Sequence, residues 1–225
     1  MTNAKRALLA LLCVSSAVAF AGGCATTRKA YYDTWEKFGY AKRERLVDNV
    51  KAARQEQVTA KQQFSTALEQ FKSVVNFNGG DLEKLYNKLD KEYQRSDAEA
   101  ARVESKIQSV KNVATALFGE WEDEIGQMSD ASLKQKSRAL LDRTRGSYQE
   151  MIHRMDSAAA TMDPVLTKFK DHVLFIKHNL NAQAIASLKG TEIEIGTDVD
   201  KLIREMEASI AEADSFIAEV QGKQK

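Results

Sequence analysis

The chain has 225 residues, and its charges nearly cancel, with 33 Lys and Arg against 32 Asp and Glu. This balance excludes the strongly basic surface by which nucleic-acid-binding proteins are recognised. Charged residues make up 29% of the chain and proline occurs once, a composition typical of long helices.

The first 23 residues are typical of a lipoprotein signal peptide. Lys5 and Arg6 precede an uncharged run from Ala7 to Phe20. This run of about 14 residues falls short of the ~20 that a bilayer-spanning helix needs. It ends in Ala21-Gly22-Gly23 directly before Cys24, the pattern of a cysteine that is lipidated and becomes the first mature residue. We therefore expect removal of residues 1–23, with residues 24–30 as an acylated N-terminus and tether.

An alternative is cleavage after Ala21, which would leave Cys24 as a free thiol. Lipidation is favoured because Cys13 is lost with the signal peptide, so an exported Cys24 has no intramolecular disulfide partner. Two or more acyl chains also anchor a protein stably where one does not. Ala25 stands where an Asp would direct retention in the inner membrane. We expect a lipid-anchored protein of the bacterial cell envelope, in the outer membrane facing the periplasm rather than in the inner membrane.

The rest of the chain has a helical repeat. Apolar residues recur at alternating spacings of three and four from Val50 to Val74, Leu82 to Trp121, Leu141 to Ile176 and Val199 to Val220. Such heptads are typical of coiled-coil packing, and their mixture of large, small and polar residues favours an antiparallel bundle. In the fourth segment the repeat is assigned to Val199, Ile203, Met206, Ile210, Ala213, Ile217 and Val220.

Turn residues divide the chain into four expected helices near 28–77, 81–128, 130–189 and 192–222. Asn78-Gly79-Gly80-Asp81, Ser129-Asp130 and Gly190 supply the breaks. Asp163-Pro164 either starts a new helix or kinks a continuous one. Short connections make successive helices antiparallel neighbours. The predicted fold class is all-α: one elongated antiparallel helical bundle or coiled coil over residues 31–222, followed by a tail at 223–225.

Several longer motifs support a family assignment. They are Tyr31-Tyr32, Trp35-Glu36-Lys37-Phe38-Gly39, the stretch from Gln70 to Asp81, Met162-Asp163-Pro164-Val165-Leu166, and the stretch from Val173 to Ala182. With these motifs the chain resembles the bacterial family called domain of unknown function 2959 over nearly its whole mature length. The resemblance implies a helical, lipoprotein-like protein. It supplies no activity and no catalytic residues.

The sequence offers little for catalysis. His172 and His178 are six residues apart, so they face different sides of a helix and do not form a metal-binding pair. No nucleophile elbow and no phosphate-binding glycine loop occur. We therefore expect no enzymatic activity, no cofactor and no metal site.

Two stretches depart from the simple repeat. Trp35, Lys37, Phe38, Lys42 and Arg43 interleave aromatic and basic side chains soon after Cys24, which suits a lipid headgroup region. Alternatively, these aromatics close one end of the bundle and the basic residues are merely solvated. The second stretch, Val173 to Leu188, is apolar around more of the helix. It is either buried on several sides or a contact face for another chain.

These observations predict a membrane-anchored, non-enzymatic envelope lipoprotein that acts as a coiled-coil spacer, scaffold or partner-binding module. Its expected partners are membrane lipid, through acylated Cys24, and a protein or a second copy bound through helix faces, with no nucleic acid. The alternative is a soluble periplasmic helical binding protein or a chaperone-like holdase.

Overall fold

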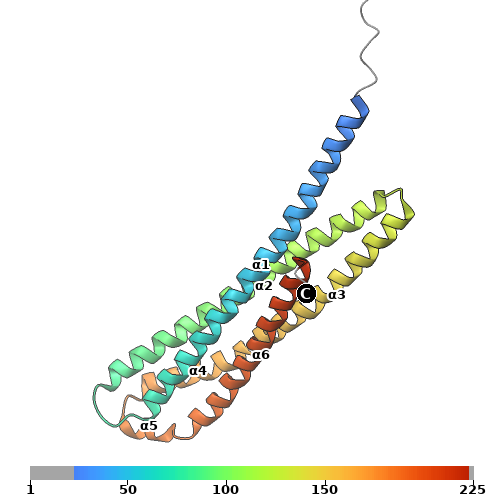
Figure 1. Ribbon diagram of the computed structural model, residues 1–225. Helices are drawn as coiled ribbons and strands as arrows, with labels where there is room; N and C mark the ends of the chain where they lie inside the picture. The colour runs from blue at the N-terminus through green and yellow to red at the C-terminus, as the bar shows by residue number, and fades with distance from the viewer. Residues whose placement is uncertain (1–22, 223–225) are drawn as a thin grey trace, which may run out of the picture. The chain divides into compact units, whose positions relative to one another are not determined.

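The computed structural model describes residues 23–222 (Figure 1), and within this range it contains helices and short connections but no strand. The helices are α1 (Gly23–Val75), α2 (Leu82–Gln127), α3 (Ala131–Ala160), α4 (Met162–His178), α5 (Ala182–Ser187) and α6 (Thr191–Val220). The predicted all-α class is confirmed. Residues 1–22 of the predicted signal peptide and the tail at 223–225 lie outside the described residues.

The chain divides into two units, Met1–Ala41 and Lys42–Lys225. The first unit is described only by the beginning of α1, whose backbone is helical from Gly23. The second unit holds the side chains discussed below. The predicted tether at 24–30 and the predicted domain limits at 31 and 222 stay predictions. No helix of the described residues combines the length and the apolar character needed to cross a membrane.

Within the second unit, α1 runs antiparallel to both α2 and α6. Lys42 of α1 pairs with Glu120 of α2, whereas Gln63, further along α1, donates a hydrogen bond to Glu92, earlier on α2. The same opposite direction relates α1 to α6. Arg54 donates two hydrogen bonds to Asp214 at 2.6 and 2.9 Å, and Lys61, later on α1, pairs with Glu207, earlier on α6, at 3.1 Å.

Helices α3 and α4 together form one arm of the bundle, antiparallel to α2 and α6. Tyr148 of α3 packs against Phe216, and Lys168 of α4 pairs with Asp198. Residue numbers therefore rise along α3 and α4 as they fall along α6, which means that the helices are antiparallel. Lys111 of α2 likewise pairs with Asp156 of α3. The second unit is therefore an up-down-up-down four-helix bundle with short connections.

The predicted third helix, 130–189, is interrupted first at Thr161. Thr161 keeps a right-handed helical backbone (φ −80°, ψ −12°), and its hydroxyl donates to the Ala158 carbonyl at 2.7 Å. Pro164 follows in the first turn of α4, where it lacks the N–H that would bond to the carbonyl of Ala160. Asp163 lies inside α4 and does not cap it. The interruption fits a proline-induced break in one arm better than a separate helix that starts at Asp163.

The second interruption contradicts the expectation of a continuous helix to residue 189. Helix α4 ends at His178, and Asn179 leaves the helical region (φ −133°, ψ 55°). The Asn181 side chain accepts a hydrogen bond from the Ala184 N–H at 2.9 Å and caps α5. Asparagine side chains compete with the helical hydrogen bonds in this way, which explains why the apolar pattern alone failed here. Gly190, with φ +99°, then leads into α6.

The core follows the predicted repeat, with one correction in α6. The assigned positions of α1 from Val50 to Val74 are all buried, and so are those of α2 from Leu89 to Trp121 except Tyr93. In α6 the structure buries Leu202, Ser209 and Phe216, whereas Ile203, Ile210 and Ile217, the next residue in each case, are half-buried. The assignment of these three isoleucines to the centre of the seam is wrong. A helix in a four-helix bundle packs over a wide stripe, so both rows are apolar and the sequence does not separate them.

Candidate functional site

The two residues of the predicted lipid-facing cluster whose side chains the structure describes, Lys42 and Arg43, contact α2 at the surface of the bundle. The Lys42 ammonium group pairs with the Glu120 carboxylate. The Arg43 guanidinium lies 5.2 Å from the centre of the Trp121 ring, a cation–π contact. Lys42 and Arg43 are therefore not merely solvated, and their contact with lipid stays a prediction.

Trp121 is held from a second side by α3. Its Nε1–H donates to Ser137 Oγ at 3.0 Å, and 9% of the residue is exposed. The indole is therefore fixed between Arg43 of α1 and Ser137 of α3. Sequence reasoning placed Trp121 in the seam but could not identify either partner.

A small depression of about 130 Å³ lies beside Trp121, where α6 ends. Leu140, Thr144 and Val220 supply much of its apolar wall, and the Thr144 hydroxyl is committed to the Leu140 carbonyl at 2.9 Å. Its charged groups come from three different helices. The full lining is Arg43, Trp121, Leu140, Arg143, Thr144, Glu219 and Val220. Two guanidinium groups beside apolar walls suit the binding of an amphipathic or anionic group.

Glu122 of α2 forms ion pairs with α3 near this depression. It accepts from Arg138 at 3.0 Å and pairs with Arg145 at 3.3 Å. Hydrogen bonding and charge from Arg145, with a smaller contribution from Arg138, lower the pKa of the Glu122 carboxyl group. Arg145 also lies 5.4 Å from the centre of the Phe118 ring. Arg138 and Arg145 are thus used within the bundle.

The N-terminal half of α3 carries an exposed row of alternating apolar and basic residues that the sequence analysis missed. Leu133 is 58% exposed and Leu140 is 46% exposed. Lys136 and Arg143 are also exposed, and within the described residues neither makes an ion pair. The four residues are spaced by three, four and three positions, so they share one face of the helix. We call this row the α3 stripe. It was missed because the repeat was traced from Leu141, on the buried side.

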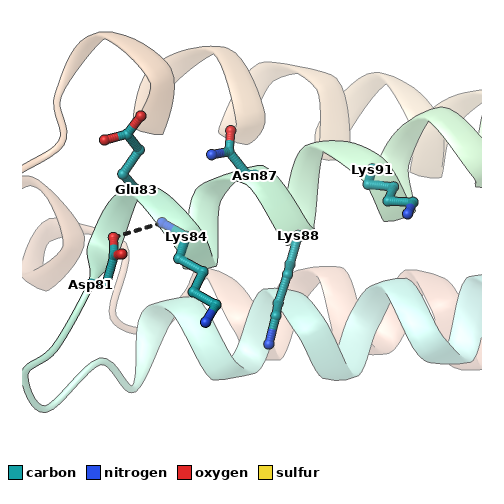
Figure 2. Close-up of a pocket in the computed structure, with 6 residues that line it drawn as sticks. All are labelled: Asp81, Glu83, Lys84, Asn87, Lys88 and Lys91. Atoms are coloured by element: carbon teal, nitrogen blue, oxygen red, sulfur yellow. Dashed lines mark hydrogen bonds between the residues drawn. The ribbon is translucent and has the colours of Figure 1, made fainter.

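A second basic surface lies on the first turns of α2 (Figure 2). Lys84, Lys88 and Lys91 line a shallow surface hollow together with Asp81, Glu83 and Asn87. Lys84 and Lys88 extend to one side of α2, and Glu83 and Asn87 to the other. The Asp81 carboxylate accepts from the Lys84 backbone N–H at 2.9 Å and caps the helix. No buried polar group is directed into this hollow, so it is a solvated helix face.

The histidines do not form a metal centre. His172 lies 5.2 Å from Phe71, centre to centre, and is half-buried, whereas His178 is exposed. Burial is the main reason why the pKa of His172 is lowered, with Asp171 and Glu194 opposing the shift. From Lys42 to Gly222 no cluster of His, Cys, Asp and Glu side chains is arranged to hold a metal ion.

The segment from Val173 to Leu188 has one packed side and one open side. Val173, Ile176, Ile185 and Leu188 are buried. On the open side are Leu174, Phe175 and Leu180, with Ile193 of α6 as a further large exposed apolar side chain. Only part of this segment is therefore buried on several sides. A partner that binds the open side stays a prediction.

Four predicted site residues lie on the first part of α1. The backbone at Cys24, Trp35, Lys37 and Phe38 is helical. Their side chains lie outside the described residues, so lipidation of Cys24 and lipid contact by the other three stay predictions.

The fold defines an antiparallel helical-bundle protein. Residues 31–220 match the family model described as "Protein of unknown function (DUF2959)", and the chain belongs to this family. The predicted resemblance is confirmed. No curated protein and no solved structure matches the chain.

Proposed function

We propose that this protein is a membrane-anchored, non-enzymatic envelope lipoprotein that acts as a helical spacer or scaffold. The observation that carries the proposal is the sequence Ala21-Gly22-Gly23-Cys24 after a short apolar run that follows Lys5 and Arg6. In this account the acylated Cys24 holds one end of the mature chain at the outer membrane, on its periplasmic side. The bundle then presents its helix faces to a protein partner or to a second copy.

The bundle suits such a role because it offers surfaces on separate parts of one stiff body. Helix α2, with 46 residues, is about 69 Å long at 1.5 Å per residue. The depression beside Trp121 is lined by the ends of α2 and α6, whereas the exposed Leu174 and Phe175 lie near the end of α4. Two such surfaces on different parts of the bundle would let a scaffold contact more than one partner.

The second candidate is a soluble periplasmic binding protein or holdase. It is favoured by the exposed apolar side chains of Leu174, Phe175, Leu180 and Ile193, because exposed apolar patches mark interaction sites. A holdase would protect unfolded clients from aggregation without an anchor. A quadruple change of these residues to Ser would abolish that protection if the protein is a holdase.

The experiment compares full-length wild type, Cys24→Ala and Cys13→Ala in a bacterial host, by palmitate labelling and membrane fractionation. Cys13→Ala is the matched control, because it removes the other cysteine, in the predicted signal peptide. We expect wild type and Cys13→Ala to be labelled and to sediment with the outer membrane, whereas Cys24→Ala is unlabelled and leaves that fraction. An unlabelled wild type, with Cys24→Ala still bound to membranes, would refute the anchor.

A further inference from the structure

We propose that the α3 stripe, formed by Leu133, Lys136, Leu140 and Arg143, binds an anionic phospholipid surface. The inference rests on the proposed function for its placement near a membrane. It differs from the sequence-based prediction, because it places a lipid contact on α3, whereas that prediction concerned Trp35, Lys37, Phe38, Lys42 and Arg43 of α1.

Helix α6 ends beside the C-terminal half of the stripe, where Leu140 and Arg143 line the depression together with Val220. It does not continue along α3 to Leu133 and Lys136. Tyr148 of α3 packs against Phe216, with 6.4 Å between ring centres, and α6 ends four residues later at Val220. Because the two helices are antiparallel, Val220 comes level with Thr144, and both line the depression beside Trp121. In Figure 1 the hairpin of α2 and α3 continues beyond the C-terminal end of α6.

The other side of this part of α3 is used for packing on α2. Ser137 accepts from Trp121, and Arg138 pairs with Glu122. Leu141 is fully buried. Within the second unit, the stripe therefore lies on the side of α3 that does not pack on α2, and Leu133 and Leu140 are exposed.

The chemistry of the stripe matches an anionic bilayer interface. Apolar side chains of an interfacial helix enter the boundary between headgroups and acyl chains, and Lys and Arg contact anionic headgroups. Residues 131–145 hold five basic residues and one acidic residue. Arg138 and Arg145 share the single carboxylate of Glu122, whereas Lys136 and Arg143 make no ion pair within the described residues and are available for lipid phosphate.

Chain length keeps this end of the bundle within reach of the anchor. Lys42 pairs with Glu120, one residue before the Trp121 that borders the depression. Only 18 residue steps separate Cys24 from Lys42, a distance of at most about 65 Å for an extended chain and about 27 Å for a helix. An acylated Cys24 would hold the stripe at a high local concentration near lipid.

The test measures binding of the full mature chain carrying Cys24→Ala to vesicles of phosphatidylglycerol with phosphatidylcholine, and to phosphatidylcholine alone. We expect binding to the anionic vesicles only, weakened by salt. Lys136→Gln with Arg143→Gln should weaken it about 30-fold, taking roughly 1 kcal/mol for each basic residue. Leu133→Ser with Leu140→Ser should also weaken it, and at exposed positions neither change should alter the helical circular dichroism.

The matched control is Lys84→Gln with Lys88→Gln, which removes two charges from the start of α2. This variant should bind anionic vesicles within about threefold of the parent. Equal weakening by the control pair would overturn the inference, since binding would then follow net charge alone. Absence of vesicle binding by the parent would overturn it too, as would stripe variants that keep vesicle binding and lose self-association.

The anchor at Cys24 and the lipid-binding α3 stripe can be refuted independently of each other. Palmitate labelling of wild type tests the anchor without vesicles, and the vesicle assay tests the stripe without acylation. Unlabelled wild type whose Cys24→Ala form still binds anionic vesicles through the stripe would refute the anchor and support the stripe.

Discussion

Ser209 Oγ donates a hydrogen bond to Gln57 Oε1 at 3.0 Å, and both side chains are fully buried between α1 and α6. The Gln57 Nε2 atom is buried and has no hydrogen-bond partner. On either side of this pair along α1 are the contacts of Arg54 with Asp214 and of Lys61 with Glu207. A buried polar pair in a helical seam fixes the register of its helices at some expense of stability. We infer that Gln57 and Ser209 set the alignment of α1 on α6.

This pair predicts a non-additive response to substitution. Ser209→Ala should lower the free energy of unfolding by about 1–3 kcal/mol, because it leaves the buried Gln57 oxygen unpaired. Gln57→Leu combined with Ser209→Ala should be nearly neutral, because both partners are then apolar. Urea unfolding of the two single variants and the double variant measures the coupling. Additive losses would contradict the assigned contact.

Truncation within α2 tests the core. Ile107 and Leu117 are buried, so Ile107→Ala and Leu117→Ala should each lower the free energy of unfolding by about 2–5 kcal/mol. Glu104→Ala, at an exposed position of the same helix, is the control and should stay within about 0.5 kcal/mol of wild type. Similar losses at all three positions would mean that the face of α2 is wrongly assigned.

Two glycines at the start of α6 give opposite predictions. Gly190 has a left-handed backbone (φ +99°), so Gly190→Ala should destabilise the protein by roughly 1 kcal/mol. Gly196 lies inside α6, and an added Cβ would meet no atom within 4 Å. Gly196→Ala should therefore raise the free energy of unfolding by about 0.5–1 kcal/mol. Thermal unfolding compares the stability of the two variants. If Gly196→Ala destabilises the protein as much as Gly190→Ala does, the start of α6 is wrongly assigned.

His172 makes stability depend on pH. Burial lowers its pKa from the ordinary 6.5, so the unfolded chain binds a proton more readily than the folded chain. The free energy of unfolding should therefore fall as pH is lowered through 6.5 toward the folded-state pKa. His172→Phe should flatten this slope, as measured by urea unfolding at a series of pH values below about 7.5. An unchanged slope in His172→Phe would show that another group is responsible.

Local sequence periodicity predicts the helices well because burial of one face dominates their stability. The seam from Val50 to Val74 is clear for that reason. The break at Asn78-Gly79-Gly80 is clear because glycines end helices. The break at Asn179 was missed because two asparagine side chains outweigh a continuing apolar pattern. In α6 two adjacent rows are both apolar, so the sequence does not show which row is buried. Contact with Tyr148 places Phe216 rather than Ile217 in the centre of the core.

The candidate site was harder to predict because its contacts join distant parts of the chain. Arg43 meets Trp121, and Trp121 meets Ser137, through packing that no local spacing reveals. The α3 stripe depends on where α6 ends relative to α3, a property of the assembled bundle. The Cys24 prediction is different, since it depends on a short local pattern that a signal peptidase reads before folding.

The most direct test of the account is the mass of the N-terminal peptide of the protein isolated from membranes. The account predicts a peptide that begins at Cys24 and carries the added mass of a diacylglyceryl group with or without a further acyl chain. A peptide that begins at Gly22 and contains an unmodified Cys24 thiol would contradict it.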